Sequence, residues 1–120
     1  MRRLMKESEP QTRVADYVAR RPLMAKHDTP ERIMALMAGE IRELEAEVEE
    51  DYDIEAIRSE ASDVLHYLFL LAHMYGFDLV EALYEKLEVN EGRFPPELFS
   101  DVSKDFQEVY LGRKRELGEI

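Results

Sequence analysis

The chain has 120 residues, a length that suits one domain spanning residues 1–120. It contains no cysteine, which excludes disulfides and thiolate metal sites. Its formal net charge is −11, and the acidic residues are densest between positions 31 and 63. A surface of this sign repels duplex DNA or RNA, whose binding depends on Lys and Arg that neutralise phosphates. We therefore expect no duplex nucleic acid among its partners.

The N-terminal stretch "MRRLMKESEPQTRV" is basic but lacks the apolar run of a signal peptide, and no later run is long enough to span a membrane. This pattern predicts a cytoplasmic protein without membrane contact. We expect residues 1–10 to be frayed and residues 11–19 to form a short helix. The stretch "RRPLMAKHDTPE" is predicted to be a connector, because Pro22 and Pro30 interrupt it.

A first long helix is predicted from Thr29 to about Glu50. Thr29 is a good N-cap, and Pro30 suits the first helical position. Apolar residues then recur at steps of four, three and four, which is the spacing of one helical face. They are Met37, Ile41, Leu44 and Val48.

A second long helix is predicted from Ile54 to Tyr75, with Asp53 as its N-cap and Gly76 as its stop. Its second half, "VLHYLFLLA", is apolar nearly all round, as in a helix buried on every side. In so short a chain, this predicts a central helix that packs on a second subunit. For His66 and His73, seven residues apart on this helix, buried packing is favoured over metal binding.

Asp78 is predicted to cap a third long helix, "LVEALYEKLEVNEGRF", which ends at Pro95-Pro96. A last helix is expected within residues 101–117, inside a C-terminal helical tail of residues 97–120. No hairpin turn separates alternating runs, so no strand is predicted. The expected fold is all-α: an antiparallel helical bundle of four to five helices, completed by oligomerisation.

Two groups of carboxylates stand out on the two long helices. Glu40, Glu43 and Glu47 lie beside the apolar face of the first helix rather than opposite it. Glu60 and Asp63, one turn apart, lead into the apolar part of the second helix. Taken alone, the first group is more typical of a solvated helix face.

The short link between the two helices makes them antiparallel neighbours, which brings the two groups of carboxylates towards each other. Converging carboxylates without lysines cannot all stay ionised unaided, so either their pKa values rise or a cation binds them. An oxygen-only ligand set favours Mg²⁺, with Mn²⁺ as the alternative, over zinc.

The third helix carries Lys86, Asn90 and Arg93 on one face. Two cations and an amide suit the oxygens of a phosphorylated ligand, although the spacing alone favours a solvated face with Glu partners.

These motifs together resemble the all-α nucleoside triphosphate pyrophosphohydrolases of the MazG-like group, and within it the dCTP pyrophosphatase branch. The stretches "GEIRELEAE" and "SEASDVLHYLFLLAHMYGFDLVEALYEKLEVNEGRFP" carry the resemblance, which covers roughly residues 27–95. The family pattern E-x-x-E, E-x-x-D and K-x-x-x-N-x-x-R before an aromatic residue and Pro is met by Glu40, Glu43, Glu60, Asp63, Lys86, Asn90, Arg93, Phe94 and Pro95. The chain departs from the pattern at Ser59, where many relatives have another Glu, and it lacks Trp.

The resemblance implies hydrolysis of a nucleoside triphosphate to the monophosphate and pyrophosphate, in the cleansing of nucleotide pools. Because family members are dimers or tetramers, the resemblance also implies that this protein forms a homodimer or homotetramer. It also implies roles for individual residues: Mg²⁺ binding by Glu40, Glu43, Glu60 and Asp63, proton acceptance by Glu43 or Glu47, and phosphate binding by Lys86, Asn90 and Arg93. His27, together with apolar or aromatic groups of the N-terminal segment, would contact the base and sugar.

Two other functions remain open from the sequence. One is a non-enzymatic acidic helical interaction module with a vestigial site. The other, which is less favoured, is a di-iron carboxylate bundle. Asp63 and His66 fit one carboxylate-x-x-His ligand pair, but such a site needs a second pair.

Overall fold

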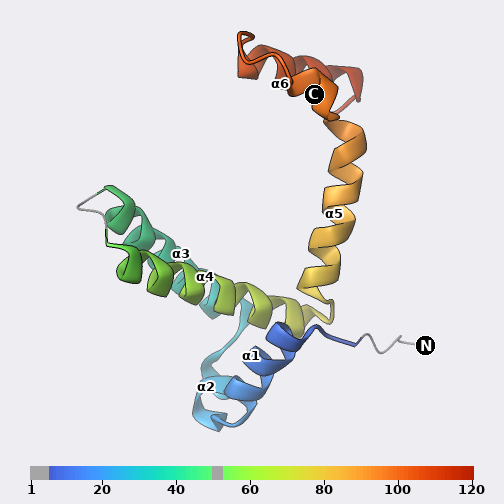
Figure 1. The fold of residues 1–120 in the computed structure, drawn as a ribbon. Helices are drawn as coiled ribbons and strands as arrows, with labels where there is room; N and C mark the ends of the chain where they lie inside the picture. The colour runs from blue at the N-terminus through green and yellow to red at the C-terminus, as the bar shows by residue number, and fades with distance from the viewer. Residues whose placement is uncertain (1–5, 50–52) are drawn as a thin grey trace. The chain divides into compact units, whose positions relative to one another are not determined.

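The computed structural model describes residues 6–49 and 53–120, and within these ranges all regular structure is helical (Figure 1). The prediction of an all-α fold is confirmed. The described residues form six α-helices, one more than the upper limit of the predicted four to five, and the additional helix is the short α2. The elements are α1 (Glu9–Ala19), α2 (Pro22–His27), α3 (Pro30–Glu49), α4 (Ile54–Tyr75), α5 (Leu79–Arg93), the 3₁₀ helix η1 (Pro96–Phe99) and α6 (Phe106–Glu116).

Helices α3 and α4 form an antiparallel hairpin, and their ends follow local capping rules (Figure 1). The Thr29 hydroxyl accepts a hydrogen bond from the Arg32 backbone N–H at 3.2 Å. The Asp53 carboxylate accepts one from the Glu55 N–H at 3.1 Å. Gly76 ends α4 with a φ of 76°, a left-handed conformation that glycine adopts without strain. The predicted caps and the predicted bounds of α4 are therefore confirmed.

The chain divides into two units, residues 1–80 and residues 81–120. In the first unit, α1 packs against α4, and the core lies where α1, α3 and α4 meet. Its buried members are Val18, Ile33 and Leu70, and Ile33 is fully buried. The single domain predicted for residues 1–120 stays a prediction.

Three local predictions for the first unit were wrong. The predicted connector contains α2, since Pro22 starts a helical turn rather than preventing one. Helix α1 begins at Glu9, so the expected fraying does not extend to residues 9 and 10. His73 is exposed rather than buried, and its ring Nδ1 pairs with the Glu7 carboxylate at 2.7 Å. Residues 1–5, also predicted to be frayed, lie outside the described part.

The fully buried Gln11 links α1 by hydrogen bonds to the connection between α4 and α5. The Gln11 side chain donates from Nε2 to the Phe77 carbonyl at 2.7 Å, and its Oε1 accepts from the Leu79 N–H at 2.9 Å. Nearby, the Ser8 N–H donates to the buried Asp78 carboxylate at 2.7 Å. A polar side chain is tolerated at this depth because both ends of its amide are paired.

Replacing Gln11 by leucine is expected to destabilise the protein by about 2–4 kcal/mol, because the Phe77 carbonyl and the Leu79 N–H lose their partners. Urea unfolding followed by circular dichroism measures this change. The matched control is the same substitution at the exposed Gln107, which is expected to change stability by less than about 0.5 kcal/mol. Equal urea midpoints for the two variants would contradict the role given to Gln11.

The second unit is organised around aromatic rings at the C-terminal end of α5. The Phe94 ring stacks on Tyr110 of α6 with centroids 5.2 Å apart, and Tyr110 stacks on Phe106 at 5.4 Å. The Arg113 guanidinium donates to the backbone carbonyls of Gly92 and Arg93, which are among the last of α5. A cation at this position satisfies carbonyls that lack partners within the helix.

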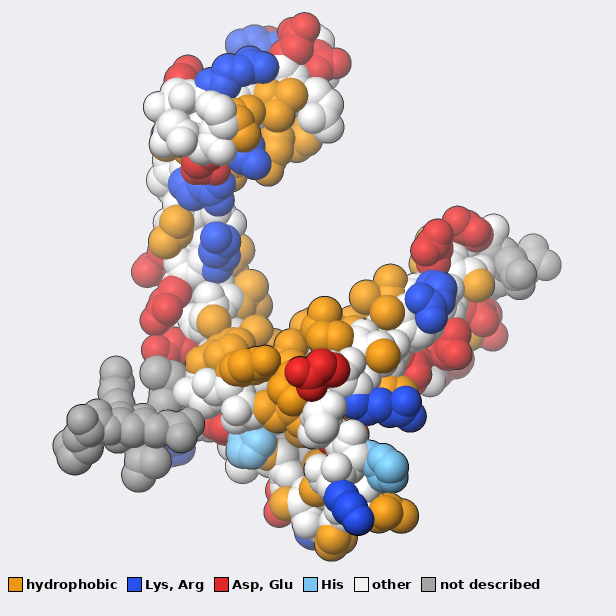
Figure 2. Space-filling model, turned by 180° about the vertical axis from the view of Figure 1, so that it is seen from behind, with side chains coloured by type: hydrophobic (Ala, Val, Ile, Leu, Met, Phe, Trp, Pro, Cys, Tyr) orange, Lys and Arg blue, Asp and Glu red, His pale blue; other side chains and the backbone are white. Residues whose placement is uncertain are grey.

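The hairpin also carries an exposed apolar stripe along its length (Figure 2). On α3, Met34, Ile41 and Val48 recur every seven residues and are 54%, 49% and 63% exposed. On α4, Leu65 and Leu68 are likewise exposed, so the second half of this helix is not buried on every side within one chain. None of the helices in the described residues has both the length and the apolar character that crossing a membrane requires.

Candidate metal centre and adjoining pocket

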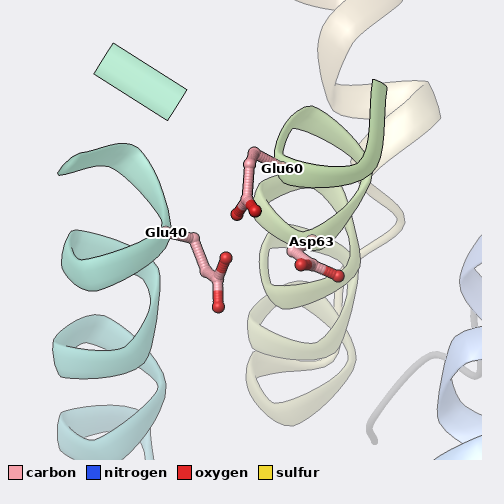
Figure 3. Close-up of side chains that lie close together, drawn as sticks. All are labelled: Glu40, Glu60 and Asp63. Carbon is pink, nitrogen blue, oxygen red and sulfur yellow. The ribbon is translucent and has the colours of Figure 1, made fainter. Parts of the chain in front are cut away.

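Three carboxylates meet across the α3–α4 hairpin (Figure 3). Glu40 projects from α3 towards Glu60 on α4, and Asp63 lies one turn further along α4. One carboxylate oxygen of each residue lies within 4.8 Å of the others. Glu40 and Glu60 are half-buried, whereas Asp63 is exposed. The antiparallel pairing thus brings together residues that are far apart in the sequence.

The electrostatics of this cluster show how closely the carboxylates interact. A hydrogen bond with Glu60, burial, and the negative charges of Glu43 and Asp63 raise the pKa of Glu40 to about 7. For Glu60, the hydrogen bond with Glu40 lowers the pKa. A hydrogen bond with Glu43, burial, and the charges of Glu43 and Asp63 together outweigh it, so the pKa of Glu60 is raised as well. Without a cation, like charges in such close contact favour retention of a proton by the cluster.

The cluster fits a hard divalent cation. Glu40 Oε2 and Glu60 Oε2 are both buried and have no hydrogen-bond partner among the described residues. An unpaired buried carboxylate oxygen is unfavourable, and a cation would satisfy both atoms at once. Since every candidate ligand is oxygen, the set favours Mg²⁺ or Mn²⁺ over zinc. No histidine belongs to this cluster within the described ranges, which argues against a di-iron bundle.

The other two predicted carboxylates lie beside this cluster but outside it. Glu43 is exposed, and it influences both Glu40 and Glu60, as their raised pKa values show. Glu47 is half-buried on α3, one turn beyond Glu43. The structure therefore brings together three of the four predicted metal ligands and places the fourth within interaction distance.

A pocket of about 680 Å³ opens beside the carboxylates. Its walls come from α1, α2, the start of α3 and the middle of α4. His27, the predicted base and sugar contact, lines it, and so does Asp63. A pocket of this volume is in the range that holds a small organic ligand. Asp63 is therefore shared between the carboxylate cluster and the pocket.

Aromatic rings form much of one side of this pocket. The Arg21 guanidinium lies 3.7 Å from the centre of the Tyr17 ring, and Tyr17 meets His66 edge to face at 5.7 Å. Tyr67 also lines the pocket. Burial and the charges of Glu40, Asp63 and Asp28 raise its pKa, so its hydroxyl remains a proton donor.

The sequence predicts apolar or aromatic groups of the N-terminal segment beside the base and sugar, but it does not single out any of these aromatic residues. One signal was available: Tyr17, on the predicted helix of residues 11–19, and Arg21, in the predicted connector, are four residues apart and closely precede His27. That the fold brings them beside Asp63 depends on the packing of α1 against α4, which no local pattern reveals.

The predicted phosphate-binding residues belong to the second unit. Lys86, Asn90 and Arg93 are all on α5, and Arg93 Nη1 donates to Asn90 Oδ1 at 2.8 Å. The Nε and Nη2 groups of Arg93 each donate to the Glu119 carboxylate. These residues therefore share one face of the helix, and Arg93 already binds a carboxylate there.

The fold and site define an all-α protein with a carboxylate cluster across a helical hairpin and a ligand-sized pocket beside it. The sequence model of the MazG nucleotide pyrophosphohydrolase domain matches residues 28–96, more than half of the chain, and the protein belongs to this family. It is therefore a nucleotide pyrophosphohydrolase, a hydrolase that acts on phosphoanhydride bonds. This finding argues against a non-enzymatic interaction module. No curated protein and no solved structure matches the chain significantly.

Proposed function

We propose that the protein is a Mg²⁺-dependent pyrophosphohydrolase that converts nucleoside or deoxynucleoside triphosphates to monophosphates and pyrophosphate. One observation carries the proposal: Asp63 belongs both to the carboxylate cluster and to the wall of the pocket. A nucleotide that placed its nucleoside in this pocket would have its phosphates beside the carboxylates. The family membership supplies the reaction class.

In this proposal Glu40, Glu60 and Asp63 hold the cation, and Glu43 is the next ligand. When bound, Mg²⁺ would supply positive charge to the phosphate oxygens and lower the pKa of a nearby water. Mn²⁺ is the alternative ion. The Oε2 atoms of Glu40 and Glu60 support this assignment, since they are buried, can coordinate a cation, and have no hydrogen-bond partner among the described residues.

The proton of the attacking water goes to Glu43 or Glu47. The water oxygen forms a bond to phosphorus while the bridge between the α- and β-phosphates breaks, and the carboxylate takes up the released proton. The exposed Glu43 is the stronger candidate, because it interacts with the cluster but, as the outermost ligand, would be the carboxylate least saturated by the cation.

The pocket is proposed to receive the base and sugar. Tyr17 and His66 offer ring faces and edges to a base, while His27 offers a ring nitrogen to a polar group. The resemblance to the dCTP pyrophosphatase branch makes dCTP the first substrate to test, with the cleansing of nucleotide pools as the biological role. In the second unit, Lys86, Asn90 and Arg93 are proposed to bind phosphate oxygens.

The exposed apolar stripe of α3 and α4 supports a homodimer or homotetramer. A second copy that covered Met34, Ile41 and Leu65 would remove this surface from water. The acidic surface supports the absence of duplex nucleic acid as a partner. A cytoplasmic location and the absence of membrane contact complete the proposal.

The test is a panel of nucleoside and deoxynucleoside triphosphates, with phosphoribosyl-ATP included, in the presence of Mg²⁺ or Mn²⁺. Pyrophosphate and orthophosphate are measured separately. We expect monophosphate and pyrophosphate in equal amounts, and no turnover in EDTA. Diphosphate with orthophosphate, or no product from any nucleotide, would refute the proposal.

A further inference from the structure

The C-terminal end of the chain turns back onto α5 and places a carboxylate on Arg93. The Arg93 Nε donates to Glu119 Oε2 at 2.8 Å, and Nη2 donates to Glu119 Oε1, so the pair is bidentate. Both side chains are about three-quarters buried, with 25% and 29% exposed. This is the geometry with which arginine also binds a phosphate group.

The position of Glu119 follows from how α6 ends. Gly118 has a φ of 74°, a left-handed conformation that reverses the chain direction. The Gly118 N–H donates to the Arg115 carbonyl at 3.0 Å, and the Glu119 N–H donates to the Lys114 carbonyl at 2.9 Å. These two bonds form a Schellman motif, which fixes the backbone of Glu119.

Helix α6 is itself held at the end of α5. The Arg113 guanidinium binds the Gly92 and Arg93 carbonyls, and the Tyr110 ring stacks on Phe94. The backbone and side chain of Arg93 are thus both engaged by the last helix and its tail. The contact with Glu119 is a product of the local fold rather than of a free chain end.

The surroundings of Glu119 are those of a bound anion. Arg93, through its hydrogen bonds and its charge, together with Lys114 and Lys86, lowers the pKa of Glu119. Two of these cations, Lys86 and Arg93, are residues proposed to bind the phosphates of the nucleotide. Glu119 lies outside residues 28–96, which the family sequence model matches.

We propose that Glu119 is an autoinhibitory group that occupies Arg93 in place of a nucleotide phosphate and must leave before that phosphate binds. The inference rests on the proposed phosphate-binding role of Lys86, Asn90 and Arg93. Release needs only rotation of the Glu119 side chain or opening of the last turn at Gly118. A purely structural ion pair would instead stabilise the fold without competing with substrate.

The test compares Glu119→Gln with Glu116→Gln, a matched control that neutralises another α6 carboxylate paired with arginine. If the tail occupies Arg93 in about nine molecules of ten, its release lowers the KM for the triphosphate about tenfold, because the competent fraction rises to one. We expect kcat to stay unchanged. Glu116→Gln should retain the KM of the original protein. In an Arg93→Gln background, Glu119→Gln should have no effect on KM.

Binding of inorganic tripolyphosphate, measured by calorimetry without nucleotide or metal, gives a second readout. We expect Glu119→Gln to bind it about tenfold more tightly than the original protein does. If the protein hydrolyses nucleotides but the variant has the original KM, the autoinhibition is refuted and the proposed function stands. If no nucleotide is hydrolysed, the proposed function fails, and tripolyphosphate decides: tighter binding by the variant supports competition at Arg93, and equal binding refutes it.

Discussion

Glu60→Gln and Asp63→Asn are each expected to lower kcat by about 1,000-fold, which corresponds to about 4 kcal/mol of lost transition-state stabilisation. Each substitution keeps the shape of the side chain but removes an anionic oxygen from the cluster with Glu40. The cation would then lose a ligand, and the developing charge on the phosphates would lose its compensation. Steady-state hydrolysis of the best nucleotide in the panel measures the change.

The control for these variants is Glu45→Gln. Glu45 is an exposed glutamate on the same helix as Glu40, outside the described carboxylate cluster. Glu45→Gln should change kcat by less than about twofold relative to the original protein, since surface substitutions away from a site have small effects. Circular dichroism must show that the helical fold of Glu60→Gln and Asp63→Asn is retained. Activity within tenfold of the original in both variants would exclude this cluster as the reaction centre.

The stability of the metal-free protein is expected to fall as the pH rises from about 5 to 8. The pKa of Glu40 is raised from 4.5 to about 7 in the folded state, first by its hydrogen bond with Glu60 and then by burial and neighbouring charges. Between these two values the folded protein keeps a proton that the unfolded chain has released. The stabilisation that this proton gives is therefore complete below the unfolded pKa of 4.5, and it is lost as the pH rises through the folded pKa of about 7. Thermal unfolding in EDTA at each pH measures the trend.

A divalent cation is expected to reverse this trend. A cation that binds the folded state at 100 times its dissociation constant stabilises it by about 2.7 kcal/mol. Because the cation competes with the proton that the raised pKa of Glu40 retains, the stabilisation by the cation should grow with pH. The midpoint of thermal unfolding with and without Mg²⁺ at pH 5.5 and pH 8 gives this difference.

Glu40→Gln separates the effect of the proton on stability from the effect of the cation. Without metal it should remove much of the pH dependence and raise the unfolding temperature at pH 8, because the repulsion with Glu60, Glu43 and Asp63 is relieved. It should also weaken the response to Mg²⁺. A metal-free protein whose stability is flat between pH 5 and pH 8, or which Mg²⁺ leaves unchanged at pH 8, would contradict the electrostatic account of this cluster.

Local signals predicted the hairpin well. Helix α4 runs from Ile54 to Tyr75 as expected, because Asp53 supplies a cap and Gly76 supplies a left-handed stop. The convergence of Glu40 with Glu60 and Asp63 followed from two periodic helices and a short link. These features depend on neighbours in the sequence or on one antiparallel pairing, and simple periodicity suffices for both.

Features that depend on packing between distant segments were not predictable. Gln11 looks like an ordinary polar residue, and only its burial against Phe77 and Leu79 gives it a structural role. His73 lies on an apolar helix, yet it is exposed and pairs with Glu7, which is 66 residues away in the sequence. The pocket depends on α1 and α2, whose apolar patterns are too short to show where they pack.

In the proposed function, part of the pocket that receives the base and sugar lies outside the range that the family model matches, whereas the carboxylate cluster lies inside it. Tyr17 on α1, Arg21 before α2 and His27 at the end of α2 all precede residues 28–96. The three clustered carboxylates lie within that matched range, as do the pocket residues His66 and Tyr67. We therefore expect ligand preference and reaction chemistry to be separately alterable. Replacing residues 17–27 by the same segment of another family member should shift the nucleotide preference towards that of the other protein, while the carboxylate cluster stays unchanged.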